Sequence, residues 1–382
     1  MIKKIKFLSN EFLTGTFDVG LTSSLSFLIF FFIRYKLNLS FTGAFGLIIS
    51  ISGILETLQN GLYQKPALLN FRTGFNGKNL NIGSLFLLII FPMYIINKTI
   101  DSNILLIGFL YCFSYLIVQN IKSYDYYYEN IIHSSKRSLN IFIFTLIYFL
   151  ILEISEFNSD FNLILFGPVV IRTIYIIKEK KKIFALTKLN KEKKETILFT
   201  VSSFLSFVRT RLPIWLLVPF GINFVGLYEI FRNLLEIYIF ISKSTLLIFT
   251  KNLNKIGNYK TIKQSILLSV FTLTLILFTF QNFTKIQLFD FKEIRSSESF
   301  IAILIIAFSV FIIETGGLIL QNNNYFKIDI LRKLLSITLF VCIFIYTHRD
   351  ISFEQFLLIS SIGFVFELAF IFFTRKYLKL YD

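Results

Sequence analysis

Apolar blocks of about 20 residues recur along the whole length of this sequence. A block of that length can cross the hydrocarbon core of a bilayer as one α-helix, which needs about 20 predominantly apolar residues. Hydrophobic residues make up 55% of the 382 positions, aromatic residues 18%, and the mean hydropathy is +0.69. So little polar surface is typical of a membrane protein. We therefore predict an all-α integral membrane protein with no water-soluble domain and no enzymatic activity.

Twelve spans of suitable length can be placed, and no connection between them is long enough to form a domain. The predicted spans are Phe12–Ile33, Phe41–Tyr63, Leu80–Ile96, Asn103–Gln119, Leu139–Leu152, Phe161–Ile177, Thr196–Val218, Phe224–Phe249, Ile262–Phe280, Ser299–Leu320, Ile330–Tyr346 and Phe353–Thr374. A basic connector, residues 179–195, separates the sixth from the seventh. We expect two six-helix lobes, residues 1–178 and 196–382.

The distribution of basic residues predicts the orientation in the membrane. If the N-terminus is cytoplasmic, the cytoplasmic segments hold 27 of the 39 Lys and Arg residues, and the outer loops hold seven. This count includes Lys263, Arg332 and Lys333, which stand at the very starts of their spans. Because cytoplasmic loops are enriched in Lys and Arg, both termini are expected in the cytoplasm. The net charge of +16 is then a topology signal and does not indicate nucleic-acid binding.

A short sequence echo relates the two halves. Residues 41–45 and 224–228 both read Phe-x-Gly-x-aromatic, and each segment opens the second helix of its half. Both halves cross the membrane an even number of times, so they would be parallel repeats. Such pseudo-symmetric repeats are common in secondary transporters.

Several ionisable residues fall inside the predicted spans, where an ionised side chain costs about 2.5–3.5 kcal/mol on insertion scales. They concentrate in the first two spans of each half. The polar positions there are Thr14, Asp18, Thr22, Ser26, Ser52, Glu56, Gln59, Asn60, Ser202, Ser206, Arg209, Arg211, Glu229, Arg232, Asn233, Glu236 and Lys243. One interpretation is ion pairing that locks helices together, for example Arg232 with Glu229 or Glu236. The other is a water-filled cavity lined by these four spans.

Arg209 and Arg211 are the first candidates for a substrate contact. A guanidinium keeps its proton, and its planar fork matches a pair of phosphate oxygens. Pro213 is expected to break the helix nearby, so the two arginines form a plausible anion clamp. Arg172 either belongs to the same chemistry or extends to the cytoplasmic surface.

The residues argue against metal and disulfide chemistry. Cys112 and Cys342 both lie in apolar blocks without partners at a suitable spacing, so we expect packing roles for them. His133 and His348 fall in loops on opposite predicted sides of the membrane, so no zinc site is expected. The sequence also lacks an ATP-binding loop. We therefore predict neither a cofactor nor a bound metal.

The chain resembles the polysaccharide flippases (O-antigen, capsule and teichoic-acid type) of the multidrug/oligosaccharidyl-lipid/polysaccharide exporter superfamily. The residues that carry this resemblance are Leu25-Ser26-Phe27, Gly43-Ala44-Phe45-Gly46-Leu47, Gly226-Leu227-Tyr228, the helix Glu229–Phe249 and Lys251-Asn252-Leu253. The resemblance implies that the two lobes alternate access and flip a lipid-linked oligosaccharide to the outer leaflet. It also implies a multi-pass protein of the bacterial inner membrane.

The resemblance assigns roles to the buried polar residues. Arg209, Arg211 and Arg232 would contact the pyrophosphate of the lipid-linked substrate. Asp18, Glu56 and Glu229 would bind counter-cations, hydrogen-bond sugar hydroxyls or pair with the arginines. Asn60 and Glu236 complete the expected substrate-binding set. The expected partners are the substrate and membrane lipids, and whether transport also uses a proton or a sodium ion stays open.

Three alternatives remain. A multidrug exporter of the same superfamily would rely on acidic cavity residues and handle cations. A polysaccharide polymerase or membrane glycosyltransferase would need catalytic residues on a large outer loop, but the longest outer connection, Gln281–Glu298, is short. A purely structural membrane scaffold would not need so many buried charges.

Overall fold

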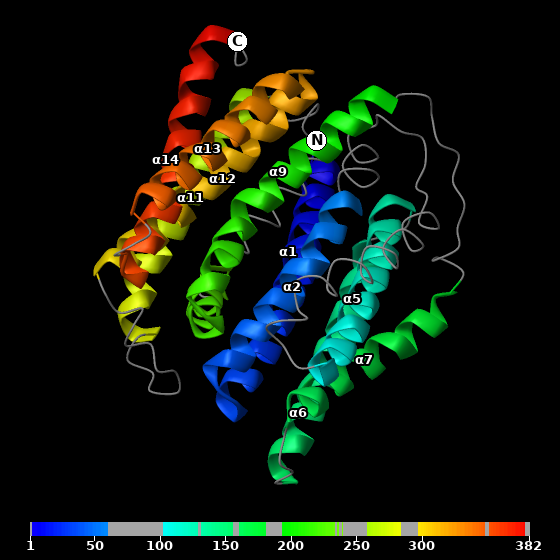
Figure 1. Cartoon of the computed structure of the whole chain (residues 1–382). Helices are drawn as coiled ribbons and strands as arrows, with labels where there is room; N and C mark the ends of the chain where they lie inside the picture. Colours follow the sequence, from blue (N-terminus) through cyan, green and yellow to red (C-terminus); the bar gives the residue numbers. More distant parts are fainter. Residues whose placement is uncertain are drawn as a thin grey trace. The chain divides into compact units, whose positions relative to one another are not determined.

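The computed structural model describes residues 2–59, 102–128, 131–155, 160–180, 193–233, 258–283, 297–347 and 351–378, together with residues 235, 236 and 239. Within these ranges all regular secondary structure is helical (Figure 1). The helices are α1 (Ile2–Lys36), α2 (Leu39–Gln59), α5 (Ser102–Tyr128), α6 (Ile131–Ile154), α7 (Phe161–Lys178), α9 (Lys193–Leu217), η2 (Val218–Phe220), α11 (Asn258–Phe283), α12 (Ser297–Asn322), α13 (Phe326–Thr347) and α14 (Phe353–Leu378). Residues 222–233 form a further helix.

The predicted spans agree closely with these helices. Ten of them match a described helix over nearly their whole length. The span Phe224–Phe249 is described mainly over its first ten residues, and the span Leu80–Ile96 lies outside the described residues. Six of the described helices are long and apolar enough to cross a membrane. The predicted all-α membrane fold is confirmed.

Large apolar side chains cover the outside of several helices, as expected of a surface that faces lipid. On α6 and α11 the exposed apolar residues are Ile143, Phe144, Ile147, Leu150, Ile151, Leu267, Val270, Phe271, Leu277 and Phe278. In water so much contiguous apolar surface would drive aggregation. In a bilayer it is the solvated face, because lipid tails are as apolar as these side chains.

The chain divides into two compact units, which are described separately. Unit 1 comprises Met1–Phe207 and Ile214–Ile230, and unit 2 comprises Val208–Pro213 and Phe231–Asp382. In unit 1, α1 packs on α6 and α2, while α5 packs on α2, α6 and α7. In unit 2, α12 is the central helix and contacts α11, α13 and α14. The predicted lobe boundary at residues 179–195 stays a prediction.

Several helices begin earlier than the sequence indicated, and two of these extensions carry buried polar residues. α6 starts at Ile131, eight residues before the predicted span, and α13 starts at Phe326, four residues before it. The added turns are polar, and four of their polar side chains, those of Ser134, Ser135, Arg137 and Asp329, are buried. Arg332 and Lys333, which the orientation argument counted with a cytoplasmic segment, are 0% and 1% exposed. Acidic partners within the protein take the place of water around these two side chains. The orientation of the chain in the membrane stays a prediction.

The two echoed glycine motifs meet in unit 1. A Cβ atom added to Gly43 would lie 2.2 Å from the carbonyl oxygen of Ile222, and one added to Gly226 would lie 2.4 Å from the carbonyl oxygen of Leu39. Each glycine thus faces the residue four positions before the other glycine. This reciprocal contact brings α2 and the helix at residues 222–233 together backbone to backbone, which small residues permit in membranes. The sequence echo therefore marks a helix crossing with local two-fold character.

This crossing predicts a large effect of a single methyl group. Gly43→Ala should destabilise the folded chain by about 1–3 kcal/mol, because the added atom meets a backbone carbonyl that cannot rotate away. The measurement is the thermal unfolding midpoint in detergent or lipid nanodiscs. Ser24→Val is the control, since Ser24 lies on an exposed face of α1. Equal midpoints for the Gly43→Ala variant and the unmodified chain would contradict the backbone contact.

Candidate functional site

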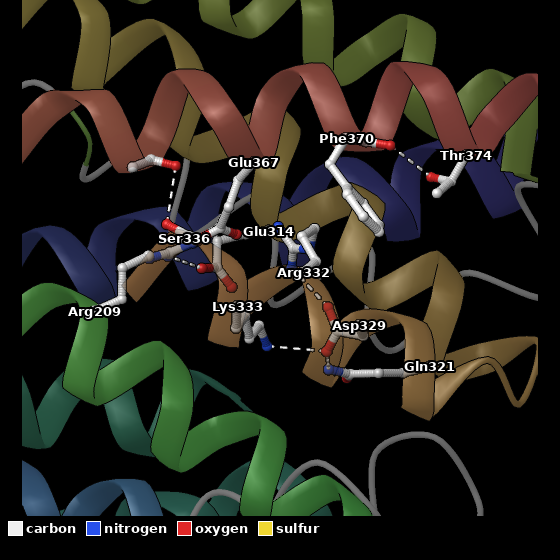
Figure 2. A network of polar contacts seen from close by, with 11 residues as sticks. Arg209, Glu314, Gln321, Asp329, Arg332, Lys333, Ser336, Glu367, Phe370 and Thr374 are labelled. Carbon is white, nitrogen blue, oxygen red and sulfur yellow. Dashed lines mark hydrogen bonds and ion pairs between the residues drawn. The ribbon is translucent and has the colours of Figure 1, made fainter. Parts of the chain in front are cut away.

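A network of six charged side chains joins four helices in unit 2 (Figure 2). Arg209 on α9 donates from Nη1 to Oε1 of Glu367 at 2.8 Å and from Nη2 to Oε1 of Glu314 at 2.6 Å. The other carboxylate oxygen of Glu367 accepts from Arg332 on α13. Glu367 on α14 is therefore shared by two arginines from two different helices.

The network continues along α13. Arg332 donates to Oδ1 of Asp329 at 2.6 Å, while Lys333 and Gln321 reach Oδ2 at 3.0 and 2.8 Å. A Cβ atom on Gly317 would lie 2.8 Å from the Arg332 guanidinium and 2.9 Å from Oδ1 of Asp329. Glycine at this position of α12 therefore leaves the space that this ion pair fills.

The charges of this network balance. Arg209, Arg332 and Lys333 supply three positive charges, and Glu314, Asp329 and Glu367 supply three negative ones. Glu314 is the most accessible member, with a side chain that is 24% exposed. The guanidinium of Arg209 also lies 4.9 Å from the centre of the Phe364 ring, on the face that attracts a cation. The charges of these six described residues therefore sum to zero.

A second buried carboxylate, Asp18 on α1, lies in unit 1. Its oxygens accept hydrogen bonds from the hydroxyls of Ser134 and Ser138 on α6. Lys122 on α5 places its ammonium nitrogen 3.0 Å from Oδ2 of Asp18 and 2.9 Å from Oγ1 of Thr22. Three helices therefore meet around one carboxylate that is 0% exposed.

Two arginines complete the buried charges of unit 1. Arg137 on α6 donates to Asp125 on α5, and its guanidinium comes within 4.0 Å of Glu179 at the end of α7. Arg172 on α7 is buried, so its expected extension to the membrane surface is not observed. It donates to the hydroxyl of Tyr111 at 3.2 Å and lies 4.4 Å from the centre of that ring.

The structure separates the two arginines of the predicted clamp. The break expected at Pro213 is not observed, because α9 continues to Leu217. Side chains two residues apart on a helix do not face each other. Arg211 is partly buried, and the Arg209 fork is held by two carboxylates. Substrate contact by these arginines stays a prediction.

The remaining predicted site residues fall in different places. Arg232 lies 3.7 Å from Glu236, as the ion-pair interpretation expects. Glu229 is 0% exposed and packs on α2, where a Cβ atom added to Gly46 would lie 2.2 Å from its Cγ. The Glu56 side chain and the whole of Asn60 lie outside the described residues.

Sequence reasoning missed half of both charged clusters. The residues it did not single out are Lys122, Ser134, Ser138, Asp329, Arg332 and Lys333. Ser134, Ser138 and Asp329 belong to helical turns that lie before the predicted spans. Helical spacing offered a signal, because Asp329 stands three and four residues before Arg332 and Lys333.

Comparison with solved structures shows which fold this is. Over 98% of this chain and 96% of the other, the structure is similar to that of the Vibrio cholerae MATE transporter VcmN, with 11% identity and a TM-score of 0.67. It is also similar to the MATE multidrug transporter DinF-BH, with 13% identity over 97% of this chain and 96% of that one and a TM-score of 0.65. A third similar structure is that of an outward-facing multidrug resistance MATE family transporter of the MOP superfamily. The identity is 10% over 97% of this chain and 96% of that one, with a TM-score of 0.63.

The chain therefore has the fold of the MATE transporters of the MOP superfamily, and it is a multi-pass membrane protein. At these sequence identities the similarity concerns the fold alone. No protein-family model matches the sequence, and no curated protein matches it. The polysaccharide flippase resemblance is thus supported at the level of the fold only.

The balanced network in unit 2 predicts an unusual order of stabilities. Arg209→Met should be strongly destabilising, by about 3–5 kcal/mol, because it leaves two carboxylates one cation short. The double variant Arg209→Met, Glu314→Met should be more stable than the single variant, because Arg332 and Lys333 then still balance Asp329 and Glu367. Thermal unfolding of both variants checks the order.

Glu354→Gln is the control for loss of a carboxylate on α14, at a partly buried position outside the network. It should unfold at the same temperature as the unmodified chain. A double variant less stable than Arg209→Met alone would show that charge balance does not govern the network.

Proposed function

We propose that this chain is a secondary transporter that exports small organic molecules by alternating access. The observation that carries the proposal is the MATE fold, which extends over at least 97% of the chain in the comparisons above. Two of those solved structures are described as multidrug transporters. A bundle with many buried charged side chains is also what ion-linked transport requires, since intramembrane ionisable residues mark ion and proton pathways in pumps and transporters.

Because Arg209 and Arg232 lie beside carboxylates, the structure favours an organic cation as the substrate over an anionic lipid-linked pyrophosphate. The argument for a pyrophosphate substrate rested on free guanidinium groups. Arg209 is held by Glu314 and Glu367, and Arg232 lies close to Glu236. With these positive charges balanced inside the protein, Arg209 and Arg232 no longer indicate an anion-binding chamber. This supports the multidrug exporter over the flippase.

Buried carboxylates supply a coupling step. If Asp18 or Glu367 takes up a proton, its cation partners lose their counter-charge in surroundings where an unpaired charge is costly. The helices that carry those partners must then rearrange or release the proton. Proton uptake and helix movement are thereby linked, which is the requirement for a proton-driven exporter.

Flipping of a lipid-linked oligosaccharide is the second candidate, and one observation favours it. Arg172 is 2% exposed, and among the described residues it has no carboxylate partner. Its Nη1 atom makes no hydrogen bond within that part of the chain. Two tyrosine rings, Tyr111 and Tyr115, lie against the guanidinium. A cation held in this way retains the capacity to bind an anion.

Transport of a cationic rhodamine dye tests the proposal. Reconstituted in proteoliposomes with an imposed pH gradient, the chain should move the dye. Asp18→Asn and Glu367→Gln should each reduce transport at least about tenfold, in line with the loss of one essential proton-transfer group. Glu153→Gln is the control, because Glu153 pairs with Lys36 in a largely exposed position and should transport normally.

The same vesicles distinguish the two candidate functions. A fluorescent lipid-linked oligosaccharide pyrophosphate is added to one leaflet, and its movement is followed by quenching from outside. The flippase would replace the exporter as the proposed function if two results are found. The lipid moves while no organic cation moves, and the lipid no longer moves in the Arg172→Gln variant.

A further inference from the structure

The surroundings of Asp18 have the composition of a monovalent cation site. The hydroxyls of Ser134 and Ser138 donate hydrogen bonds to the Asp18 carboxylate. The Thr22 hydroxyl is linked to the same carboxylate through the ammonium of Lys122. Carboxylate and hydroxyl oxygens are the ligands that hard cations prefer. These oxygen ligands come from α1 and α6, which pack against each other in unit 1. The arrangement is therefore held by helix packing and does not depend on a loop.

The ammonium group of Lys122 contacts two oxygens of this cluster. Its ammonium nitrogen lies 3.0 Å from Asp18 Oδ2 and 2.9 Å from Thr22 Oγ1, so it contacts two of the oxygen ligands that a small cation would use. Lys122 enters from a third helix, α5, and its side chain is 12% exposed. A lysine ammonium is a compact point charge on a flexible stem, unlike the broad guanidinium of an arginine.

We propose that Lys122 is the built-in cation of this site: its ammonium takes the place of a sodium ion at Asp18. The unmodified chain then binds no sodium there, and removing the ammonium creates a sodium site. For the transport cycle, which rests on the proposed function, it follows that export does not draw on a sodium gradient.

The charged network of unit 2 supports the same principle independently. There, too, buried carboxylates are matched by side-chain cations, with Arg209 and Arg332 on Glu367 and Lys333 on Asp329. Neutrality inside this chain is thus supplied by its own lysines and arginines. An ordinary structural ion pair at Asp18 would give the same distances, so the distinguishing property is whether sodium can replace the ammonium.

Sodium rescue of Lys122→Met is the decisive experiment. Thermal unfolding and binding of radioactive sodium are measured in sodium chloride and in choline chloride at equal ionic strength. Lys122→Met should unfold at a lower temperature in choline, and its midpoint should rise in a saturable manner with sodium. It should bind about one sodium ion per chain more than the unmodified chain, because one oxygen cluster becomes available.

Three further chains define the controls. The unmodified protein should show the same midpoint in sodium and choline. The double variant Asp18→Asn, Lys122→Met lacks both charges and should show no sodium response. Lys36→Met removes the lysine of the exposed pair with Glu153 and should also gain no sodium response.

Two results would overturn the inference. One is a Lys122→Met chain that neither binds sodium nor gains stability from it, including one that stays unfolded at every sodium concentration while the double variant folds. The other is sodium binding at Asp18 in the unmodified chain. Neither readout requires transport, so failure of dye export by the unmodified protein would remove the proposed function and leave this inference standing.

Discussion

Unit 2 depends on Glu367, whose two carboxylate oxygens each accept a hydrogen bond from a different arginine. An ionised carboxylate in the membrane interior has no water to solvate it, so its partners must come from the protein. Arg209 reaches Glu367 from α9 and Arg332 reaches it from α13, while α14 carries the carboxylate itself. Glu314 and Asp329 then balance the arginines. Because Arg209 and Glu367 find their partners on other helices, the packing of four helices and the electrostatics cannot be separated.

The same constraint shapes unit 1 with different residue types. Asp18 is satisfied by a lysine and two serines, while Arg172 lies against two tyrosine rings. These solutions differ in strength, since a lysine on a flexible stem is easier to displace than an arginine held at both ends of its fork. Groups that must change partners during a transport cycle are therefore better sought around Asp18 than within the doubly held guanidiniums of unit 2.

Glycine governs how closely the helices approach. Gly43 and Gly226 bring two backbones together, while Gly46 and Gly317 leave room for the charged side chains of Glu229 and of the Arg332–Asp329 pair. In a membrane, where lipid tails compete with apolar side chains, such close fits are a principal source of helix association. The glycines of this chain thus serve the helix crossing and the buried charges at the same time.

The sequence by itself determined the helices, because bilayer thickness sets the length of each apolar block and the blocks can be counted. It also indicated the reciprocal glycine motifs and the polar stripe that contains Asp18. Only the tertiary structure decided which charges pair, since Arg209 meets partners 105 and 158 positions away. It also moved polar turns such as residues 131–138 from predicted loops into a helix in which Ser134, Ser135 and Arg137 are buried. Hydropathy cannot foresee this, because a charged turn reads as surface until its counter-charge, remote in sequence, is known.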